Sequence, residues 1–239
     1  MVSPGTNSLM FEILTPDQTG FFRACEKVAQ LFAQREAEFG FNPEIDRPAV
    51  SMPEFLADQA GWVSSAISGD GPVTILTTWS DKLAPILRER GFAFRPIAWH
   101  AGPFNSGIFR REGAGRERYF ELVNEEAPEI APAHVLTIHD AHGFAGGAIS
   151  ALRDNAAWLA VMCVRPGMPA GTGSRLWEAL VRDIAARGIG RLDLGTQTAE
   201  RFYQHCGMQV TDRVIPRLRW RTAPDGKVWN DLVMMGIDL

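Results

Sequence analysis

The sequence predicts an α/β protein in which a mixed, mostly antiparallel sheet flanked by helices follows a second, N-terminal α/β domain. Apolar runs rich in β-branched residues alternate with segments whose apolar residues recur at helical spacing. Tight turns at 140–143 and 223–227 each join two strand-like runs, as in antiparallel hairpins. A glycine-rich, charged segment at 101–118 separates the halves, so we expect domains over 1–102 and 103–239.

The first half of the chain begins with a strand at 11–14 and a helix that Thr15 or Asp17 caps. The later elements expected here are a helix over 53–68, a strand over 73–79, a helix over 80–91 and a strand over 92–100. The segment 101–118 that follows is either a linker or an edge hairpin. No sequence motif marks this half.

The second half is richer in strands. Strands are expected over 133–140, 143–152, 156–164, 190–196, 208–220 and 228–239, with one helix after 171 and a short helix over 198–207. The run AAWLAVMCV at 156–164 is almost entirely apolar, so it must be a central strand of the sheet.

Composition excludes several classes of protein. The chain has 239 residues, 46% of them hydrophobic, and a net charge of −4, which argues against a general nucleic-acid surface. Cys25, Cys163 and Cys206 are too widely spaced for a disulfide framework or a zinc site. There is no 18-residue apolar window and no secretory signal at the N-terminus. We therefore expect a cytoplasmic protein that engages neither membrane nor nucleic acid, with its oligomeric state open, a homodimer included.

A glycine-bearing loop at 165–173 lies between an apolar strand and a helix. The free N–H groups of a first helical turn, together with the helix dipole, form an anion site, and Gly171 and Gly173 would let a phosphate approach the backbone. The Walker and dinucleotide-binding patterns are both absent. The alternative is a strand-to-helix turn that needs flexible backbone and nothing more.

The order of these elements and two short motifs resemble the GNAT superfamily of N-acetyltransferases, over residues 118–239. Members usually carry Q/R-x-x-G-x-G/A after a strand that ends V-x-P. Here Val164-Arg165-Pro166 precedes the loop MPAGTG at 168–173. Members often carry A-x-x-x-Y-x-x-x-G-F farther on, and this chain has AERFYQHCGM at 199–208.

The chain departs from the family pattern at several positions. Met168 stands where the loop usually has a basic or amide side chain, and the loop is one residue shorter. Thr196 stands where an asparagine is often found, and Met208 where phenylalanine is common. Because the phosphate cradle is made of backbone N–H groups, the loss of the side chain at 168 removes only one contact.

The resemblance implies transfer of an acetyl (acyl) group from acetyl-CoA to a primary amine of a small-molecule or amino-acid-like acceptor, by direct attack. The cofactor would lie where the fourth and fifth strands of the sheet separate. Its implied contacts are the main chain at Met162 and Val164, the loop residues Met168, Pro169, Ala170, Gly171, Thr172, Gly173 and Ser174, and Thr196. No metal is implied.

Tyr203 is the catalytic residue that the resemblance implies, as the acid that protonates the departing thiolate. The alternative is a ring that packs under the sheet with its hydroxyl at the rim. The base is open. His139, Asp140 and His142 lie at a hairpin turn and Asp193 on the next strand, but a turn of this kind is usually only polar, and water could accept the proton.

The first half of the chain has two interpretations under this resemblance. It is either a degenerate second copy, since 73–92 has a strand, a helix and a Gly-Phe ending, or an unrelated α/β unit that shapes the acceptor site. The aromatic residues Trp62, Trp79, Trp99 and Phe104 would line an acceptor pocket or belong to the core. Two other functions stay open: a non-catalytic CoA-binding or protein-interaction module, and a structural domain that binds no CoA.

Overall fold

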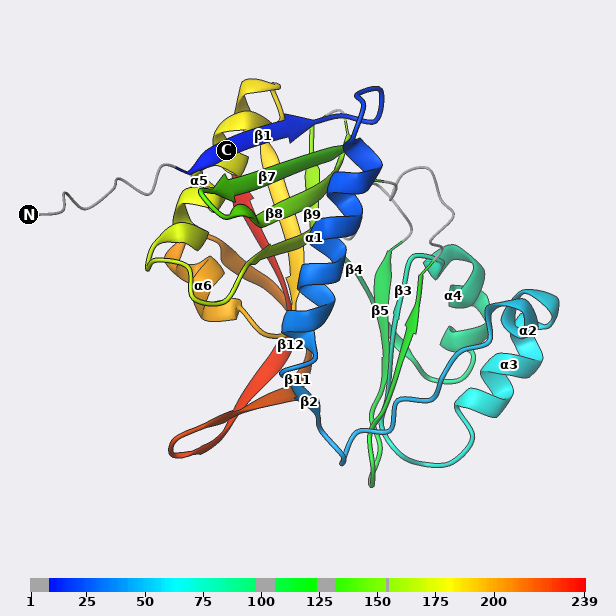
Figure 1. Cartoon of the computed structure of the whole chain (residues 1–239). Coiled ribbons are helices and arrows are strands. Elements are labelled where there is room, and N and C mark those ends of the chain that lie inside the picture. The colour runs from blue at the N-terminus through cyan, green and yellow to red at the C-terminus, as the bar shows by residue number, and fades with distance from the viewer. Residues whose placement is uncertain (1–8, 98–105, 124–131, 154) are drawn as a thin grey trace, which may run out of the picture.

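The computed structural model describes residues 9–97, 106–123, 132–153 and 155–239 (Figure 1). Its strands form two separate sheets, one of eight strands and one of four. No helix within the described ranges combines the length and the apolar character that crossing a bilayer requires.

The large sheet has the strand order β1-β7-β8-β9-β10-β12-β11-β2. Its strands are β1 (Met10–Leu14), β2 (Gly40–Phe41), β7 (His134–Asp140), β8 (Gly143–Leu152), β9 (Ala157–Val164), β10 (Arg191–Thr196), β11 (Gln209–Ala223) and β12 (Gly226–Asp238). Every neighbouring pair is antiparallel except β9 with β10, which is parallel. The predicted α/β class with a mixed, mostly antiparallel sheet is confirmed, and β9 is central as expected.

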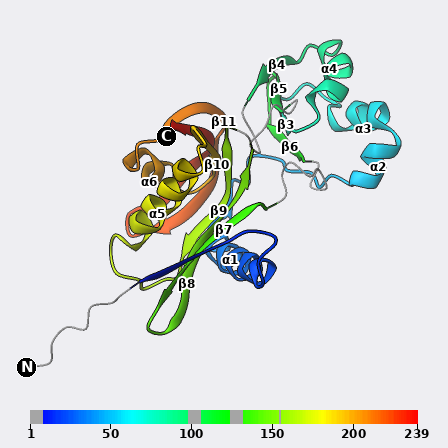
Figure 2. The same cartoon turned by 90° about the horizontal axis from the view of Figure 1, so that it is seen from above.

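Helices cover both faces of the large sheet (Figure 2). One face carries α1 (Phe21–Glu36), and the other carries α5 (Thr172–Ala186) and α6 (Glu200–His205). The apolar stripe of α5, formed by Leu176, Leu180 and Ile184, is fully buried in the core under this second face. The first helix begins later than expected. Its N-cap is Gly20, with φ 96°, while the Thr15 hydroxyl donates to Asp17 instead.

The small sheet has the order β4-β5-β3-β6 and lies on the same side of the large sheet as α1 (Figures 1 and 2). Its elements are α2 (Met52–Ala57), α3 (Gln59–Ala66), β3 (Val73–Thr77), α4 (Ser80–Arg88), β4 (Ala93–Pro96), β5 (Gly107–Arg111) and β6 (Arg118–Leu122). Its three helices pack on the sheet through a separate core that includes Phe55, Leu83 and Phe109.

The helix expected over 53–68 is in fact two helices. Asp58 ends α2 with extended backbone, and its side-chain oxygen accepts the Gly61 N–H at 2.8 Å. An aspartate at this position therefore caps a new helix, which explains why a continuous helix over 53–68 was the wrong expectation.

The segment 101–118 is neither a linker nor an edge hairpin where the structure describes it. β5 is an inner strand, paired with β3 and β4, and its Ile108 and Phe109 are buried. The flanking glycines and arginines concealed this short apolar strand. The start of the segment, 98–105, lies outside the described residues, and so do Trp99 and Phe104.

Each of the two sheets contains strands from before and from after residue 102. β1, α1 and β2 belong to the large sheet, whereas β5 and β6 belong to the small one. The start of the chain therefore contributes two strands, β1 and β2, to the large sheet. We propose that the second domain is the unit that holds the small sheet, inserted between β2 and β7.

Of the aromatic residues proposed for an acceptor pocket, Trp62 and Trp79 are described, and both pack inside the small unit. Trp62 and Trp79 lie 5.2 and 5.1 Å from the Phe55 ring, measured between ring centroids. A further apolar cluster joins the two units, with Leu76 and Ile108 on one side and Trp158 on the other. The small unit is thus packed against the large sheet through side chains that neither unit could bury alone.

We predict that Gly147→Ala destabilises the protein by about 2 kcal/mol, because overpacking forces the surrounding backbone to shift. A Cβ at this position in β8 would lie 2.5 Å from Val28 of α1 and 2.6 Å from the Leu136 carbonyl oxygen. Urea unfolding measures the effect. Gly173→Ala is the control, since its Cβ would meet nothing closer than Phe202 at 3.5 Å. Equal stability of both variants would contradict the close approach of α1 to the sheet.

Candidate functional site

The central strands β9 and β10 are paired over only part of their length. Leu192, Asp193 and Leu194 pair with Ala157, Trp158 and Leu159, and no pairing continues beyond them. β9 remains paired with β8 up to Val164, with a shift in register that leaves Ala160 as an extra residue. Such a bulge bends its strand, so β9 turns away from β10 and opens a gap in the middle of the sheet.

The backbone of β9 presents unpaired groups to this gap. The Arg165 N–H donates to the Ala145 carbonyl oxygen at 2.8 Å, which makes these two residues a hydrogen-bonded pair between antiparallel strands. Hydrogen-bonded and non-hydrogen-bonded pairs alternate along such strands. The N–H and C=O groups of Met162 and Val164 therefore point away from β8, the orientation that their predicted role requires.

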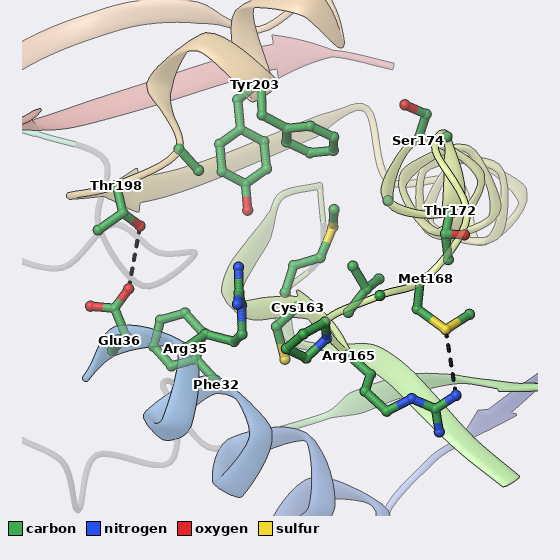
Figure 3. Close-up of a pocket in the computed structure, with 18 of the residues that line it drawn as sticks. Phe32, Arg35, Glu36, Cys163, Arg165, Met168, Thr172, Ser174, Thr198 and Tyr203 are labelled. Carbon is green, nitrogen blue, oxygen red and sulfur yellow. Dashed lines mark hydrogen bonds between the residues drawn. The ribbon is translucent and has the colours of Figure 1, made fainter. Parts of the chain in front are cut away.

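A cavity of about 580 Å³ lies at this gap (Figure 3). Its walls come from β9 and the loop after it, the start of α5, the start of α6 and the last turn of α1. The predicted residues that line it are Met162, Val164, Met168, Pro169, Gly171, Thr172, Gly173, Ser174 and Tyr203. Ala170 and Thr196 were predicted with them but do not line it.

Two positions in the loop before α5 have a positive φ that favours glycine. Gly167 has φ 78°, and Gly171, the N-cap of the helix, has φ 83°, whereas Gly173 is already helical and does not need a positive φ. The Thr172 hydroxyl donates to the Pro169 carbonyl oxygen at 2.7 Å, so it closes the loop and is not free to donate to a phosphate. Among the described hydrogen bonds, none uses the N–H of Gly173 or Ser174, and both residues line the cavity.

Thr196 has a structural role at the end of β10. Its hydroxyl oxygen accepts the backbone N–H groups of Thr198 at 3.4 Å and Ala199 at 3.0 Å. These bonds turn the chain from the strand into α6, which carries Tyr203. Thr196 therefore acts on the site indirectly, by fixing the turn that leads into α6.

Tyr203 is buried, yet its hydroxyl faces the cavity (Figure 3). Its ring packs against Trp177 and Phe202 at centroid distances of 5.6 and 5.2 Å. Burial raises the pKa of the hydroxyl well above its usual value, and the nearby Cys206 and Cys163 raise it further. The group is therefore a neutral donor throughout the physiological pH range.

The last turn of α1 was missed by the sequence analysis. Phe32, Arg35 and Glu36 line the cavity from the side opposite α5, and their spacing of i, i+3 and i+4 places them on one side of the helix. Phe39, three residues beyond the end of α1, also lines the cavity. The signal was in the sequence, since a pair of opposite charges interrupts an otherwise apolar stripe.

Glu36 is held by a buried arginine from β11. The Arg219 guanidinium pairs with the Glu36 carboxylate and donates to the Glu36 carbonyl oxygen at 2.7 Å and to that of Phe39 at 3.2 Å. The Thr198 hydroxyl donates to the second carboxylate oxygen at 3.3 Å. The Arg219 side chain is only 7% exposed, so this pair fastens the end of α1 to the sheet beside the cavity.

None of the residues suggested as a base lines the cavity. Asp140 instead pairs with Arg165 at 2.7 Å, and Asp193 pairs with Arg191 at 2.8 Å. His139 lies 3.2 Å from the Thr137 hydroxyl, and His142 donates its backbone N–H to Asp140. Within the described parts of the chain, no group of three or more metal-ligating side chains is present.

The cysteines near the cavity are poor nucleophiles. Burial raises the pKa of Cys163 to about 12, although Arg35 acts in the opposite direction. Burial also raises the pKa of Cys206. Both thiols therefore stay protonated at neutral pH, and the site offers no thiolate for covalent catalysis.

The chain matches no protein-family model and no curated protein. Over 44% of its length it is similar to solved acetyltransferases. A GNAT family acetyltransferase from Elizabethkingia anophelis with acetyl-CoA bound is 14% identical, with a TM-score of 0.37 and 76% of that chain covered. An IAA acetyltransferase from Bacillus cereus is also 14% identical, with a TM-score of 0.37 and 77% covered. The N-acetylglutamate synthase from Neisseria gonorrhoeae is 15% identical, with a TM-score of 0.35 and 25% covered.

We predict that Arg219→Met lowers the free energy of unfolding by about 3 kcal/mol, because it leaves Glu36 as an uncompensated, largely buried charge. Arg213→Met is the matched control on the same strand. Arg213 pairs with the carboxylates of Glu200 and Asp231, but its side chain is 44% exposed, so we expect a loss of at most about 1 kcal/mol. Chemical denaturation of both variants measures the difference, and equal losses would contradict a buried clamp.

Proposed function

We propose that this protein transfers an acetyl group from acetyl-CoA to the primary amine of a small acceptor. One observation carries the proposal. The gap between β9 and β10 brings together an unpaired strand edge, free N–H groups at the start of α5 and a neutral tyrosine hydroxyl. A thioester of CoA needs these three features at separate points along its length: the pantetheine amides, the pyrophosphate and the sulfur.

The residues of the cavity fit the cofactor. A Cβ at Gly167 or Gly171 would meet nothing within 4 Å, so the loop borders open space where a pyrophosphate could lie against the backbone. The Arg165 guanidinium lies 3.7 Å from the Met168 sulfur and brings a positive charge to this loop. Because Asp140 pairs with Arg165, that charge offsets the missing basic side chain at position 168 only in part.

Acetyl-CoA, when bound, would supply an acetyl group activated as a thioester. The N–H of Met162 faces the gap and is the donor for the negative charge that develops on the carbonyl oxygen. Tyr203 holds the proton that the sulfur receives. With an amine displacing the thiolate, the Tyr203 hydroxyl would give its proton to the departing sulfur. The proton that the nitrogen then loses restores Tyr203.

The acceptor must arrive as a free amine, so an ammonium ion first loses one proton to water. Within the part of the chain that the structure describes, Glu36 is the one acidic residue that lines the cavity, and it is already engaged by Arg219. Deprotonation by solvent is consistent with this arrangement, because it requires no side-chain base next to the amine.

Calorimetric titration with acetyl-CoA tests the proposal, and acetyl-pantetheine, which lacks the pyrophosphate, is the comparison. We expect micromolar binding of acetyl-CoA and much weaker binding of acetyl-pantetheine. Absence of heat at several temperatures, with the protein folded, contradicts the proposal. Binding without turnover of any amine would instead favour a non-catalytic CoA-binding module.

We predict that Gly173→Asp weakens the binding of acetyl-CoA by more than about 100-fold, because it places a carboxylate among the N–H groups that face the pyrophosphate. Gly173→Asn is the control, since it has the same size without the charge. A calorimetric titration of both variants separates charge from bulk. Similar losses in the two variants would argue against an anion at this position.

We predict that Tyr203→Phe lowers kcat by about 100-fold with little change in the affinity for acetyl-CoA, because only the proton donor is lost. Because burial raises the pKa of Tyr203, its protonated form persists at high pH. The rate of the native protein should then keep rising to pH 10 as the acceptor amine deprotonates. Steady-state kinetics from pH 6 to 10 test this, and a fall in rate below pH 9 would count against Tyr203 as the acid.

A further inference from the structure

Among the described residues that line the cavity, Arg35 and Arg165 are cationic, and they lie at different ends of it (Figure 3). Arg165 lies beside Met168 near the start of α5, and it is engaged by Asp140 and by the Phe144 carbonyl oxygen. Arg35 comes from α1, and its guanidinium points toward the Tyr203 hydroxyl. The second cation is therefore on the side of the cavity that the cofactor loop does not use.

The guanidinium of Arg35 has only a weak partner. Its carboxylate partner is Glu38, one turn farther along the chain, at 2.5 Å. The side chains of Arg35 and Glu38 are 40% and 52% exposed, so their ion pair adds little stability. A carboxylate that enters the cavity can take the place of Glu38 at little cost and can bind the guanidinium with two parallel hydrogen bonds.

The position of Arg35 is fixed by its neighbour. Glu36 is fastened to Arg219, which also binds the backbone carbonyls of Glu36 and Phe39. These contacts hold the helix end from which Arg35 extends. The cavity is thus provided with a charged group on a rigid element, as a specific binding site requires.

The walls beside Arg35 are apolar. Phe32, one turn before Arg35 on α1, and Phe39, just beyond the end of α1, both line the cavity. Aromatic side chains in such a position bury the apolar part of a ligand while the guanidinium fixes its charged group.

We infer that the acceptor is an α-amino acid with an apolar side chain, whose carboxylate binds Arg35. In an α-amino acid the amine and the carboxylate are attached to the same carbon. A carboxylate held by Arg35 therefore brings the amine to the part of the cavity that the Tyr203 hydroxyl faces. Phe32 and Phe39 receive the apolar side chain. This inference rests on the proposed function and names its acceptor.

A set of three matched amines tests the inference. L-phenylalanine, L-phenylalaninamide and 2-phenylethylamine share one side chain and differ in the group beside the amine. With acetyl-CoA as donor, we expect the native protein to acetylate L-phenylalanine with a kcat/KM at least about 10-fold above that of the other two. L-leucine and L-methionine, with their amides, extend the set to other apolar side chains.

The variant Arg35→Met should remove this preference by lowering kcat/KM for the amino acids about 10- to 100-fold, with a far smaller effect on the amides. Arg23→Met, on an exposed position of the same helix, is the matched control and should keep the preference. Glu38→Gln should keep it too, since it removes only the competing carboxylate.

The outcomes separate the two proposals. Calorimetry that detects no acetyl-CoA binding overturns the proposed function and this inference with it. Binding of acetyl-CoA with equal use of amino acids and amides, or with use of no amino acid in the set, overturns the inference alone. A carboxylate preference that survives in Arg35→Met also overturns it.

Discussion

The incomplete pairing of β9 with β10 is the constraint on which the rest of the site depends. Three paired residues on each strand are enough to hold the sheet together, and the bulge at Ala160 then turns β9 aside. A fully paired β9 would satisfy its own backbone groups and would close the cavity. Because the pairing stops, the edge of β9, the start of α5 and the Tyr203 hydroxyl all face one volume.

The charged side chains that line the cavity differ in how firmly they are paired. Glu36 is bound by a buried arginine, and Arg165 by an aspartate that is 8% exposed. Arg35 alone relies on a carboxylate at the surface. Neutral backbone donors at the start of α5 face one end of the cavity, and the one loosely paired cation faces the other. The two ends therefore favour different anions, one held by N–H groups and one by a guanidinium.

The sequence predicted those parts of the site that lie within short, continuous segments of the chain. The loop at 165–173 and Tyr203 each belong to a short motif, so their chemistry could be predicted from neighbouring residues. Thr196 does not line the cavity, and its hydroxyl accepts N–H groups of the turn into α6, so its contact with a cofactor stays a prediction. The clamp between Glu36 and Arg219 spans 183 residues of the chain, and no local pattern joins two such positions. β5 was hidden for another reason, since glycines and arginines surround its few buried residues.

The division of the chain between the two sheets has a consequence for how the protein folds. The chain leaves the large sheet after Phe41 and returns to it at His134, so β1 can pair with β7 only after a long loop closes. Contacts between distant residues form slowly, whereas the small sheet pairs strands that are closer along the chain. Because β2 and β7 lie near opposite edges of the large sheet, the inserted unit connects Phe41 on one side of the sheet with His134 on the other. We therefore expect the small sheet, which is inserted between β2 and β7, to form before β1 pairs with β7 in the large sheet.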